Sequence, residues 1–242
     1  MARPLIIAHR ALSPGARENT ASALARLDAA GADLAELDVR LSLDRRPFVL
    51  HDAFLRRTTR GHGWVRLWPS PLLRRLPLRD VPEGERLAPL SRVLATVPAG
   101  IQPALHLKDR GALRQVLRAI ERHGTPGRTW LWLERPQDVA RARRRLPELR
   151  CTLLRPAGWT ATARGDYFHD AQRAGARAVS VPWGVITDEL TAHAHRHGLL
   201  VFSRLEDPAA IPHVVRAGLD GIITDDPRTV ADALAALAGN DR

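Results

Sequence analysis

The chain has 242 residues, enough for one large domain and few for two. Hydrophobic residues make up 45% and charged residues 26%, which are ordinary globular proportions and exclude a disordered or fibrous chain. The formal net charge of +11 would usually suggest nucleic-acid binding. No apolar stretch approaches the roughly 18–20 residues that cross a bilayer, which excludes a membrane-spanning helix.

Short apolar runs rich in β-branched residues alternate along the chain with longer segments of helical period. The runs predict eight strands, at Leu5–Arg10, Leu34–Arg40, Gln102–Lys108, Arg128–Arg135, Arg150–Arg155, Ala178–Trp183, Leu199–Leu205 and Gly221–Asp226. The intervening segments predict helices at Glu18–Ala30, Leu90–Pro98, Ala112–His123, Gln137–Leu149, Asp166–Ala174, Asp188–His197, Pro208–Ala217 and Arg228–Ala238. Several of these helices end at a glycine before the next strand, as helix C-termini often do.

The alternation of strands and helices predicts parallel βαβ units. Eight units in this length predict an α/β fold of the (β/α)8 TIM-barrel type, with residues 1–242 as a single domain. A doubly wound open sheet is the competing architecture, but no glycine-rich dinucleotide or P-loop pattern favours it. Residues from about 41 to 89 are rich in Pro and Arg and too long for a βα loop. They predict a small inserted lobe after the second strand, at the C-terminal rim where barrel active sites lie.

Two features of the chain bear on its location. The apolar run before His9 is too short for the core of a signal peptide. The one cysteine, Cys151, cannot form an internal disulfide, so nothing indicates an oxidising compartment. We therefore expect a cytoplasmic protein without a transmembrane segment.

Arginine accounts for 36 of the 37 basic residues, and the one lysine is Lys108. We attribute the arginine excess to a coding preference rather than to a nucleic-acid surface, although the basic field favours anionic substrates. In a chain that otherwise uses arginine, a lysine indicates a site that needs a compact ammonium group.

This interpretation of the arginine excess predicts weak binding of duplex DNA without sequence preference. Such binding is driven by the release of counterions, so its affinity should fall steeply as salt is added. Fluorescence anisotropy of labelled duplex DNA, titrated at several salt concentrations, measures this dependence. Nanomolar binding at physiological salt would contradict the interpretation.

Polar residues near the C-terminal ends of barrel strands are the candidates for catalysis. The first three predicted strands and the lobe carry His9, Arg10, Glu36, Asp38, His51, Asp52, His106 and Lys108. On the second and third strands the two polar residues are two positions apart, so each pair lies on one side of its strand. Any one of these residues has an ordinary explanation, such as an ion pair with a nearby arginine. As a set, they would be costly to place inside an apolar barrel without a ligand or a metal.

Recognisable motifs extend from residue 6 to residue 227. In chain order they read HRA, RENT, GAD, ELDV, HD, RTT and GLDGIITDDP. They resemble the motifs of the glycerophosphodiester phosphodiesterase family, a TIM-barrel family that has His-Arg-Gly, Pro-Glu-Asn-Thr, Gly-Ala-Asp, Glu-x-Asp-Val, His-Asp, Arg-Thr-Thr and Gly-Val-Asp-Gly-Ile-Ile-Thr-Asp-x-Pro. The resemblance implies metal-dependent cleavage of a phosphodiester at the rim of a barrel.

The resemblance also implies roles for individual residues. By matched position, His9 and His51 correspond to the general acid and base. Arg10 and Lys108 correspond to the cations that bind the substrate phosphate. Two imidazoles with a pKa near neutrality are suited to removing one proton and delivering another.

The family's metal site differs here at one position. Glu36 and Asp38 match two metal carboxylates, but the family's Glu-x-Lys is His106-Leu107-Lys108 in this chain, so His106 stands in place of a glutamate ligand. Two carboxylates and one imidazole suit Ca²⁺ poorly and suit Mn²⁺, Zn²⁺ or Fe²⁺ better. We expect one divalent ion, with Mg²⁺, Mn²⁺, Ca²⁺ and Zn²⁺ all left open.

The resemblance therefore implies metal-dependent hydrolysis of a glycerophosphodiester-type substrate to an alcohol and sn-glycerol 3-phosphate or a related phosphomonoester. The expected partner is this small-molecule phosphodiester, with no specific nucleic acid. Two alternatives stay open. One is a catalytically silent protein that binds phosphodiesters or phospholipids, and the other is a metal-dependent lyase or transferase of a biosynthetic pathway on the same scaffold.

Weaker candidates lie elsewhere in the chain. His193, His195 and His197 have the look of a metal cluster, but they end a helix that should point to the rim opposite the active site. A solvated helix end is therefore the more ordinary interpretation. Trp159 and Trp183 follow strands and are candidates for walls of the substrate pocket.

Overall fold

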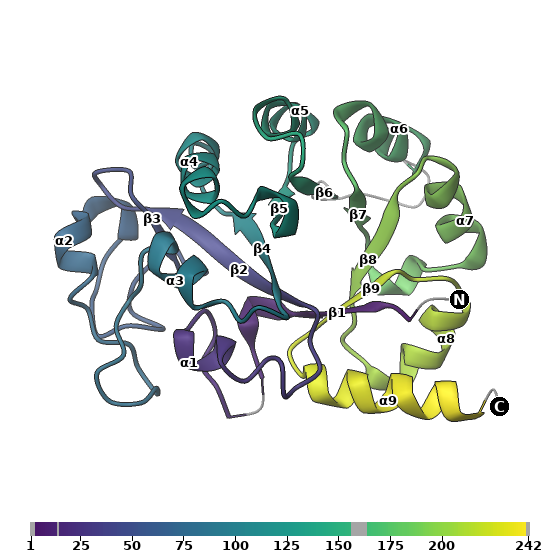
Figure 1. Cartoon of the computed structure of the whole chain (residues 1–242), viewed down its shortest axis with the longest axis horizontal. Helices are drawn as coiled ribbons and strands as arrows, with labels where there is room; N and C mark the ends of the chain where they lie inside the picture. Colours follow the sequence, from purple (N-terminus) through teal and green to yellow (C-terminus); the bar gives the residue numbers. More distant parts are fainter. Residues whose placement is uncertain (1–2, 14, 156–163, 241–242) are drawn as a thin grey trace.

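The apolar runs form the strands of a barrel in the computed structural model, which describes residues 3–13, 15–155 and 164–240 (Figure 1). Within these residues, eight parallel strands are β1 (Leu5–Ala8), β2 (Leu34–Leu41), β4 (Gln102–Leu107), β5 (Trp130–Leu133), β6 (Arg150–Leu154), β7 (Ala178–Ser180), β8 (Leu200–Arg204) and β9 (Gly221–Thr224). They are hydrogen-bonded in the order β1-β9-β8-β7-β6-β5-β4-β2, and pairing of β1 with β2 closes the ring. The predicted TIM-barrel fold is confirmed.

Helices cover the outside of the barrel. They are α1 (Ala21–Leu24), α3 (Leu90–Thr96), α4 (Leu113–His123), α5 (Pro136–Arg145), α6 (Arg164–Ala174), α7 (Asp188–Arg196), α8 (Ile211–Arg216) and α9 (Pro227–Asn240). Each predicted helix has a counterpart, with bounds that differ mostly by a few residues. No helix in the described part of the chain is both long and apolar enough to cross a membrane.

The first predicted helix is much shorter than expected. The sequence predicts a helix over Glu18–Ala30, whereas only Ala21–Leu24 is α-helical and the following residues form turns. Asn19 has a φ of +58°, which is incompatible with a right-handed helix. Thr20 then caps the helix by accepting a hydrogen bond from the Ala23 N–H. The helix therefore begins only after Thr20.

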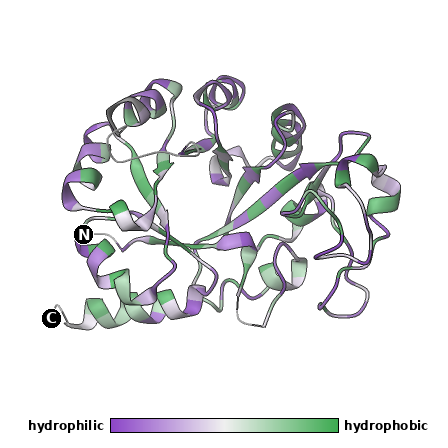
Figure 2. Cartoon of the chain, turned by 180° about the vertical axis from the view of Figure 1, so that it is seen from behind, coloured by the Kyte–Doolittle hydropathy of each residue, from purple (hydrophilic) through white to green (hydrophobic). Residues whose placement is uncertain are grey.

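The apolar side chains form separate layers inside and outside the strands. Inside the barrel lie Ile7, Leu34, Ala104, Trp130, Trp132, Ala178, Phe202 and Ile223. A larger cluster fills the space between the strands and the surrounding helices. Figure 2 shows the resulting green of the strands, together with purple bands along the long strand β2. Two of the polar residues of β2, Glu36 and Asp38, are almost completely buried.

Gly221 allows the aromatic ring of Phe202 to pack inside the barrel. A Cβ atom on Gly221 would lie 2.5 Å from Cδ1 of Phe202 and 3.2 Å from Cδ1 of Ile7. Gly221→Ala is therefore expected to lower the free energy of unfolding by about 1–3 kcal/mol, the usual cost of overpacking. Urea denaturation measures the change. Gly184→Ala is the matched control, because a Cβ on Gly184 meets nothing within 4 Å and should change stability by no more than about 0.5 kcal/mol.

We refer to residues 41–89, which begin at the last residue of β2, as the lobe. Its strand β3 (Pro47–Val49) runs antiparallel to β2, and the 3-10 helix η2 (Val65–Leu67) and the short helix α2 (Ser70–Leu73) follow. A small apolar cluster holds the lobe together: Phe48, Leu50, Leu55, Val65, Leu73 and Leu87. The lobe projects from the C-terminal end of β2, and α2 lies at the outer edge of the molecule (Figure 1).

Candidate active site

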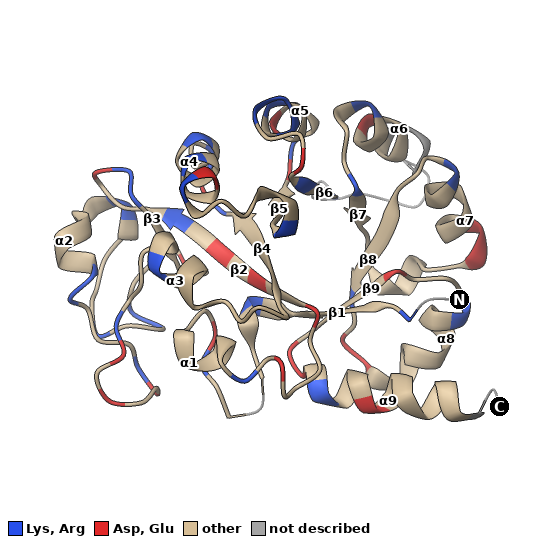
Figure 3. Ribbon diagram, in the orientation of Figure 1, with Lys and Arg blue, Asp and Glu red and all other residues tan. Residues whose placement is uncertain are grey.

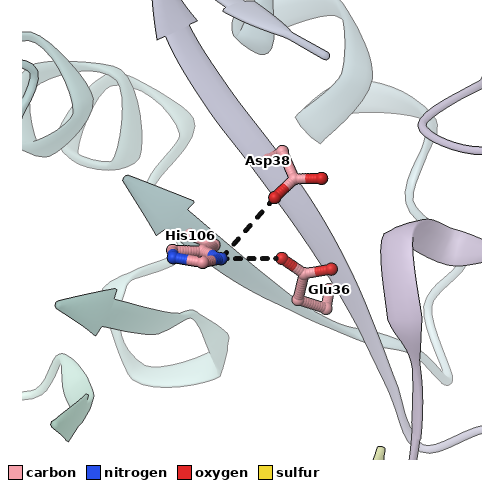
Figure 4. A group of neighbouring side chains, drawn as sticks. All are labelled: Glu36, Asp38 and His106. Carbon is pink, nitrogen blue, oxygen red and sulfur yellow. Dashed lines mark ion pairs between the residues drawn. The ribbon is translucent and has the colours of Figure 1, made fainter. Parts of the chain in front are cut away.

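Strand register brings two carboxylates and an imidazole together inside the barrel. Asp38 on β2 lies directly opposite His106 on β4, and Glu36 lies two residues earlier on the same side of β2. The His106 Nδ1 atom is 3.4 Å from Oε1 of Glu36 and 3.5 Å from Oδ1 of Asp38 (Figure 4). In Figure 3 these acids appear as the red bands of β2. Among the described residues, no other group of three or more His, Cys, Asp or Glu side chains has ligand atoms close enough to share a metal ion.

Asp38 is held in place by groups that favour its ionised form. Its Oδ1 atom is 3.1 Å from Nζ of Lys108. Asn19 donates to Oδ2 at 3.0 Å and accepts from the Asp38 N–H at 3.1 Å. Burial opposes the ionisation of Asp38, but Lys108, His106 and Asn19 together lower its pKa below the ordinary value. Asp38 is therefore a carboxylate with little freedom to turn.

Glu36 is less well satisfied. Its Oε2 atom accepts a hydrogen bond of 2.7 Å from the Arg10 N–H, whereas its Oε1 atom is buried without a hydrogen-bond partner. Burial and the nearby charge of Asp38 raise the pKa of Glu36 to about 8. Beside it, burial and Lys108 lower the pKa of His106 to about 4, so this imidazole is neutral at pH 7. The cluster thus has an orphaned acceptor and a neutral imidazole, a donor set that suits a bound cation.

The chain leaves β1 through a tight left-handed turn. The sequence predicts a strand as far as Arg10, but β1 ends at Ala8 and residues 9–11 form a 3-10 turn. Arg10 and Ala11 have φ values of +53° and +54°, and this turn directs the Arg10 N–H to Glu36. The family has glycine where this chain has Ala11. A side chain in this conformation typically costs about 1–2 kcal/mol, which explains the preference for glycine.

The Arg10 side chain lies at the edge of the same cluster. Its Nη1 atom is 3.2 Å from Glu18, and its Nε atom is 3.6 Å from Oδ2 of Asp38. Glu18 also accepts hydrogen bonds of 2.9 and 2.6 Å from Arg57 of the lobe. Glu18 therefore links the two arginines and fixes the position of Arg10.

Each of the two candidate acid–base histidines contacts a carboxylate through its Nδ1 atom. Nδ1 of His9 lies 2.6 Å from Oδ1 of Asp225, and Nδ1 of His51 lies 2.7 Å from Oδ1 of Asp52. A carboxylate accepts the Nδ1 proton, so in the neutral imidazole the lone pair is on Nε2. Arg57 hydrogen-bonds to Asp52 and lowers the pKa of that carboxyl to about 2. Burial lowers the pKa of His9.

Both histidines border the carboxylate cluster. His9 lies close enough to Glu36 for its charge to lower the pKa of the Glu36 carboxyl. His51 has the same effect on the pKa of Asp38. The backbone agrees, because the Leu50 N–H donates to the Asp38 carbonyl at 3.0 Å. The fold therefore brings together all of the predicted site residues: His9, Arg10, Glu36, Asp38, His51, His106 and Lys108.

Two residues of this arrangement, Asn19 and Asp225, had no role in the sequence-based prediction. Asn19 holds Asp38 and Asp225 orients His9, while Asp52, already named as a polar residue of the lobe, orients His51. Asn19 and Asp225 both lie within the motifs noted above, in RENT and GLDGIITDDP. Those motifs were the signal, but their contacts depend on strand pairing across the whole chain.

The weaker candidates lie apart from this cluster. Near the end of α7, His195 contacts Asp220 at 2.8 Å and His197 contacts Gln172 at 2.9 Å. The His193 and His197 rings are 5.2 Å apart, without a carboxylate that completes a metal site among the described residues. Trp183 begins a 3-10 helix and packs partly against the outer core. Trp159 lies outside the described residues.

Comparison with known proteins gives matches over nearly the whole chain. The family model described as the glycerophosphoryl diester phosphodiesterase family matches residues 9–229. A glycerophosphodiester phosphodiesterase from Caldanaerobacter subterraneus is 29% identical, over 94% of this chain and 96% of its own. A solved structure of a putative glycerophosphoryl diester phosphodiesterase from Agrobacterium tumefaciens has a TM-score of 0.85 at 16% identity, covering 98% of this chain and 100% of that chain. An Oleispira antarctica phosphodiesterase, solved in complex with the product sn-glycerol-3-phosphate, has a TM-score of 0.83 at 22% identity, covering 96% and 97%. The matches span the barrel and the lobe alike.

Proposed function

Because this chain belongs to the glycerophosphoryl diester phosphodiesterase family and is a phosphoric diester hydrolase, we propose that it cleaves a glycerophosphodiester to an alcohol and sn-glycerol 3-phosphate. One observation carries this proposal. Two histidines, each oriented by a carboxylate through Nδ1, border a buried cluster of two carboxylates and two cations. Such an arrangement offers proton transfer on both sides of a bound phosphate.

His9 and His51 are the proposed general acid and base. With Nδ1 bonded to Asp225, neutral His9 has the Nε2 lone pair available to accept a proton. Its pKa is lowered by burial, so His9 is neutral at pH 7. His51, held in the same manner by Asp52, is the second proton-transfer group. Each carboxylate also stabilises the imidazolium that forms when its histidine takes up a proton.

Lys108 and Arg10 are the proposed phosphate-binding cations. Both side chains lie at the edge of the cluster, with 18% and 19% of their surface exposed. Charge builds up on the non-bridging oxygens of the phosphate as the ester bond breaks, and cations fixed beside them stabilise it. The ammonium of Lys108, 3.1 Å from Asp38, is a compact point charge, whereas the guanidinium of Arg10 is planar and delocalised.

Glu36, Asp38 and His106 would hold one divalent ion. The unpartnered Oε1 of Glu36 lies beside Nδ1 of His106, which supports the assignment. When bound, the ion would neutralise negative charge on the substrate phosphate. The mixture of oxygen and nitrogen donors favours Mn²⁺, Zn²⁺ or Fe²⁺ over Ca²⁺.

The proposed reaction is tested with glycerophosphodiesters that differ in their alcohol. The purified protein is treated with a chelator, supplied with one divalent metal at a time, and assayed for sn-glycerol 3-phosphate. We expect metal-dependent formation of this product from at least one diester. Substrate binding without any product would favour the silent binder, and a cyclic phosphate as the end product would favour the lyase.

Asp225 is a proposed positioning residue for His9. Asp225→Asn is expected to lower kcat by up to about 10⁴-fold, the known effect of replacing the aspartate that fixes the tautomer of an acid–base histidine. The substitution also removes a charge that favours protonated His9, so the acidic limb of the kcat/KM profile should move to lower pH. Asp226→Asn is the matched control, since an asparagine at this position can still accept the Thr229 N–H and cap α9. An unchanged pH profile in Asp225→Asn would show that Asp225 does not act through His9.

A further inference from the structure

The exposed apolar surface of this protein is concentrated in the lobe. Among the described residues, all of the large hydrophobic side chains that are clearly exposed belong to the lobe: Leu43 (57% exposed), Phe54 (47%), Trp64 (39%), Leu67 (59%) and Leu72 (45%). We refer to these five side chains as the lobe patch. Apolar side chains that gather in one place on a surface usually mark a site of interaction.

Contacts between neighbouring segments join the members of the lobe patch. The rings of Phe54 and Trp64 contact each other in a tilted arrangement, with centroids 4.0 Å apart. Leu67 follows within the same turn, since its N–H donates to the Trp64 carbonyl. The Leu43 N–H donates to the carbonyl of Trp68, the residue after Leu67, at 3.0 Å. In Figure 2, α2 adds green to the outer edge of the lobe, at the right of the view. The patch therefore draws on segments of the lobe that pack or hydrogen-bond against one another.

The lobe patch is not needed to fill the core of the lobe. That core consists of other, buried residues, among them Phe48, Leu55 and Leu73. Leu72 shows the contrast, because it is exposed while Leu73, its neighbour in α2, is fully buried. The patch residues are thus apolar at positions where folding would tolerate a polar side chain.

The lobe that carries the patch is rich in arginine. Residues 41–89 contain ten arginines and five acidic residues, and the lobe is accordingly rich in blue in Figure 3. The Arg66 guanidinium lies 5.3 Å from the centre of the Trp64 ring. Arg56, Arg60 and Arg66 are exposed and form no ion pair with any described residue. Aromatic and aliphatic side chains together with unpaired cations are typical of surfaces that bind anionic lipid headgroups.

The lobe patch also lies close to the active site. Phe54 comes three residues after His51, and the Ala53 carbonyl between them accepts a hydrogen bond of 2.9 Å from the Val65 N–H. Arg57 connects the same segment to Glu18 and Asp52. A surface held by the lobe patch would therefore lie near His51 and Asp52.

We propose that the lobe patch docks this protein on an anionic lipid surface, with Trp64, Leu67 and Leu72 entering the headgroup region. Charge favours this partner over a second copy of the chain, since two lobes with an excess of arginine would repel one another. The docking does not depend on the proposed reaction, and it would hold for a catalytically silent chain as well.

Vesicle flotation tests the docking. The full chain is mixed with vesicles of phosphatidylcholine alone or of phosphatidylcholine rich in phosphatidylglycerol, and the bound fraction is measured at low and physiological salt. We expect binding to the anionic vesicles, and a partition coefficient that falls about tenfold or more in Leu67→Gln/Leu72→Gln, because two apolar side chains no longer enter the interface. Thermal unfolding checks that this variant is folded.

Two arginine variants separate local from general charge. Arg56→Gln/Arg66→Gln removes two cations beside the patch, and Arg173→Gln/Arg196→Gln removes two exposed cations from α6 and α7, on the other side of the barrel from α2 (Figure 1). The first pair should weaken vesicle binding severalfold and the second pair much less. Equal losses in the two arginine pairs, unchanged binding in the leucine variant, or no binding by the wild type would each overturn the proposal. A wild-type dimer that the leucine variant makes monomeric, without vesicle binding, would assign the patch to self-association instead.

Discussion

Replacing either His9 or His51 by alanine is expected to lower kcat by about 10²–10⁴-fold, the usual contribution of a general acid or base. Each imidazole is fixed at Nδ1 by a carboxylate, so its Nε2 atom is the proton-transfer atom that alanine removes. The free energy of unfolding should change by no more than about 1 kcal/mol, since each variant loses one partly exposed hydrogen bond. Steady-state kinetics on the best glycerophosphodiester, together with urea denaturation, measures both quantities.

His213→Ala is the matched control for these variants. His213 is an exposed histidine on α8, one of the helices outside the barrel. Its substitution should leave kcat unchanged. Turnover close to that of the wild type in His9→Ala or His51→Ala would remove that residue from the mechanism. A large loss of stability in either variant would instead show that the histidine has a structural role.

The barrel strands were predictable because their signal is local. A strand buried on both faces needs a short run of apolar residues, and all eight runs named from the sequence became strands. The predicted ends of the first strand and the first helix were wrong, because there the backbone conformation serves contacts of the candidate active site. The first strand stops at Ala8 and the first helix starts after Thr20, because positive φ values at Arg10 and Asn19 serve contacts with Glu36 and Asp38. No local propensity encodes these contacts.

The same distinction applies to the site. Spacing on a strand predicts that Glu36 and Asp38 share a face, and the structure bears this out. The Asp225 contact with His9 spans 216 residues and arises because β1 pairs with β9 to close the barrel. The predicted barrel includes that closure, but the sequence pattern does not show which side chains meet across it. The lobe patch could not be predicted from the sequence either, because the fold of the lobe determines which of its leucines are buried and which are exposed.

Replacing His106 by alanine is expected to weaken divalent metal binding by at least about 100-fold. His106 is one of three side chains whose ligand atoms lie together, and losing even an outer partner of a metal ligand commonly costs 10–100-fold in affinity. Titration calorimetry with Mn²⁺ and Zn²⁺ on the chelator-treated protein measures the change without any assay of activity. His213→Ala again serves as the control and should bind both ions as the wild type does.

His106→Glu should alter which metal is preferred. The substitution replaces a nitrogen donor by an oxygen donor and adds a negative charge beside Glu36 and Asp38. Hard cations prefer oxygen donors, so the affinity for Mg²⁺ and Ca²⁺ should rise relative to that for Zn²⁺. The same calorimetric titrations with four metals give this ratio. An unchanged order of affinities would show that residue 106 is not a ligand.

The pH dependence of metal binding shows whether the ion competes with a proton on His106 or with a proton on Glu36. An ordinary histidine ligand would make affinity fall as the pH drops through roughly 6–7. In the folded chain burial and Lys108 lower the pKa of His106 to about 4, while burial and Asp38 raise the pKa of Glu36 to about 8. The ion must therefore displace a proton from Glu36, and its affinity should rise with pH from about 4 to about 8.

About one proton should leave for each ion bound near pH 7, because Glu36 is protonated and His106 is neutral there. The dependence of the binding enthalpy on the ionisation enthalpy of the buffer counts these protons. Glu36→Gln removes the proton that the ion displaces, so proton release should vanish along with much of the affinity. If the wild type binds no divalent ion and His106→Glu creates binding, then the histidine has abolished the metal site. The chain would in that case hold its phosphodiester with Arg10 and Lys108 alone, as a binding protein without metal-dependent hydrolysis.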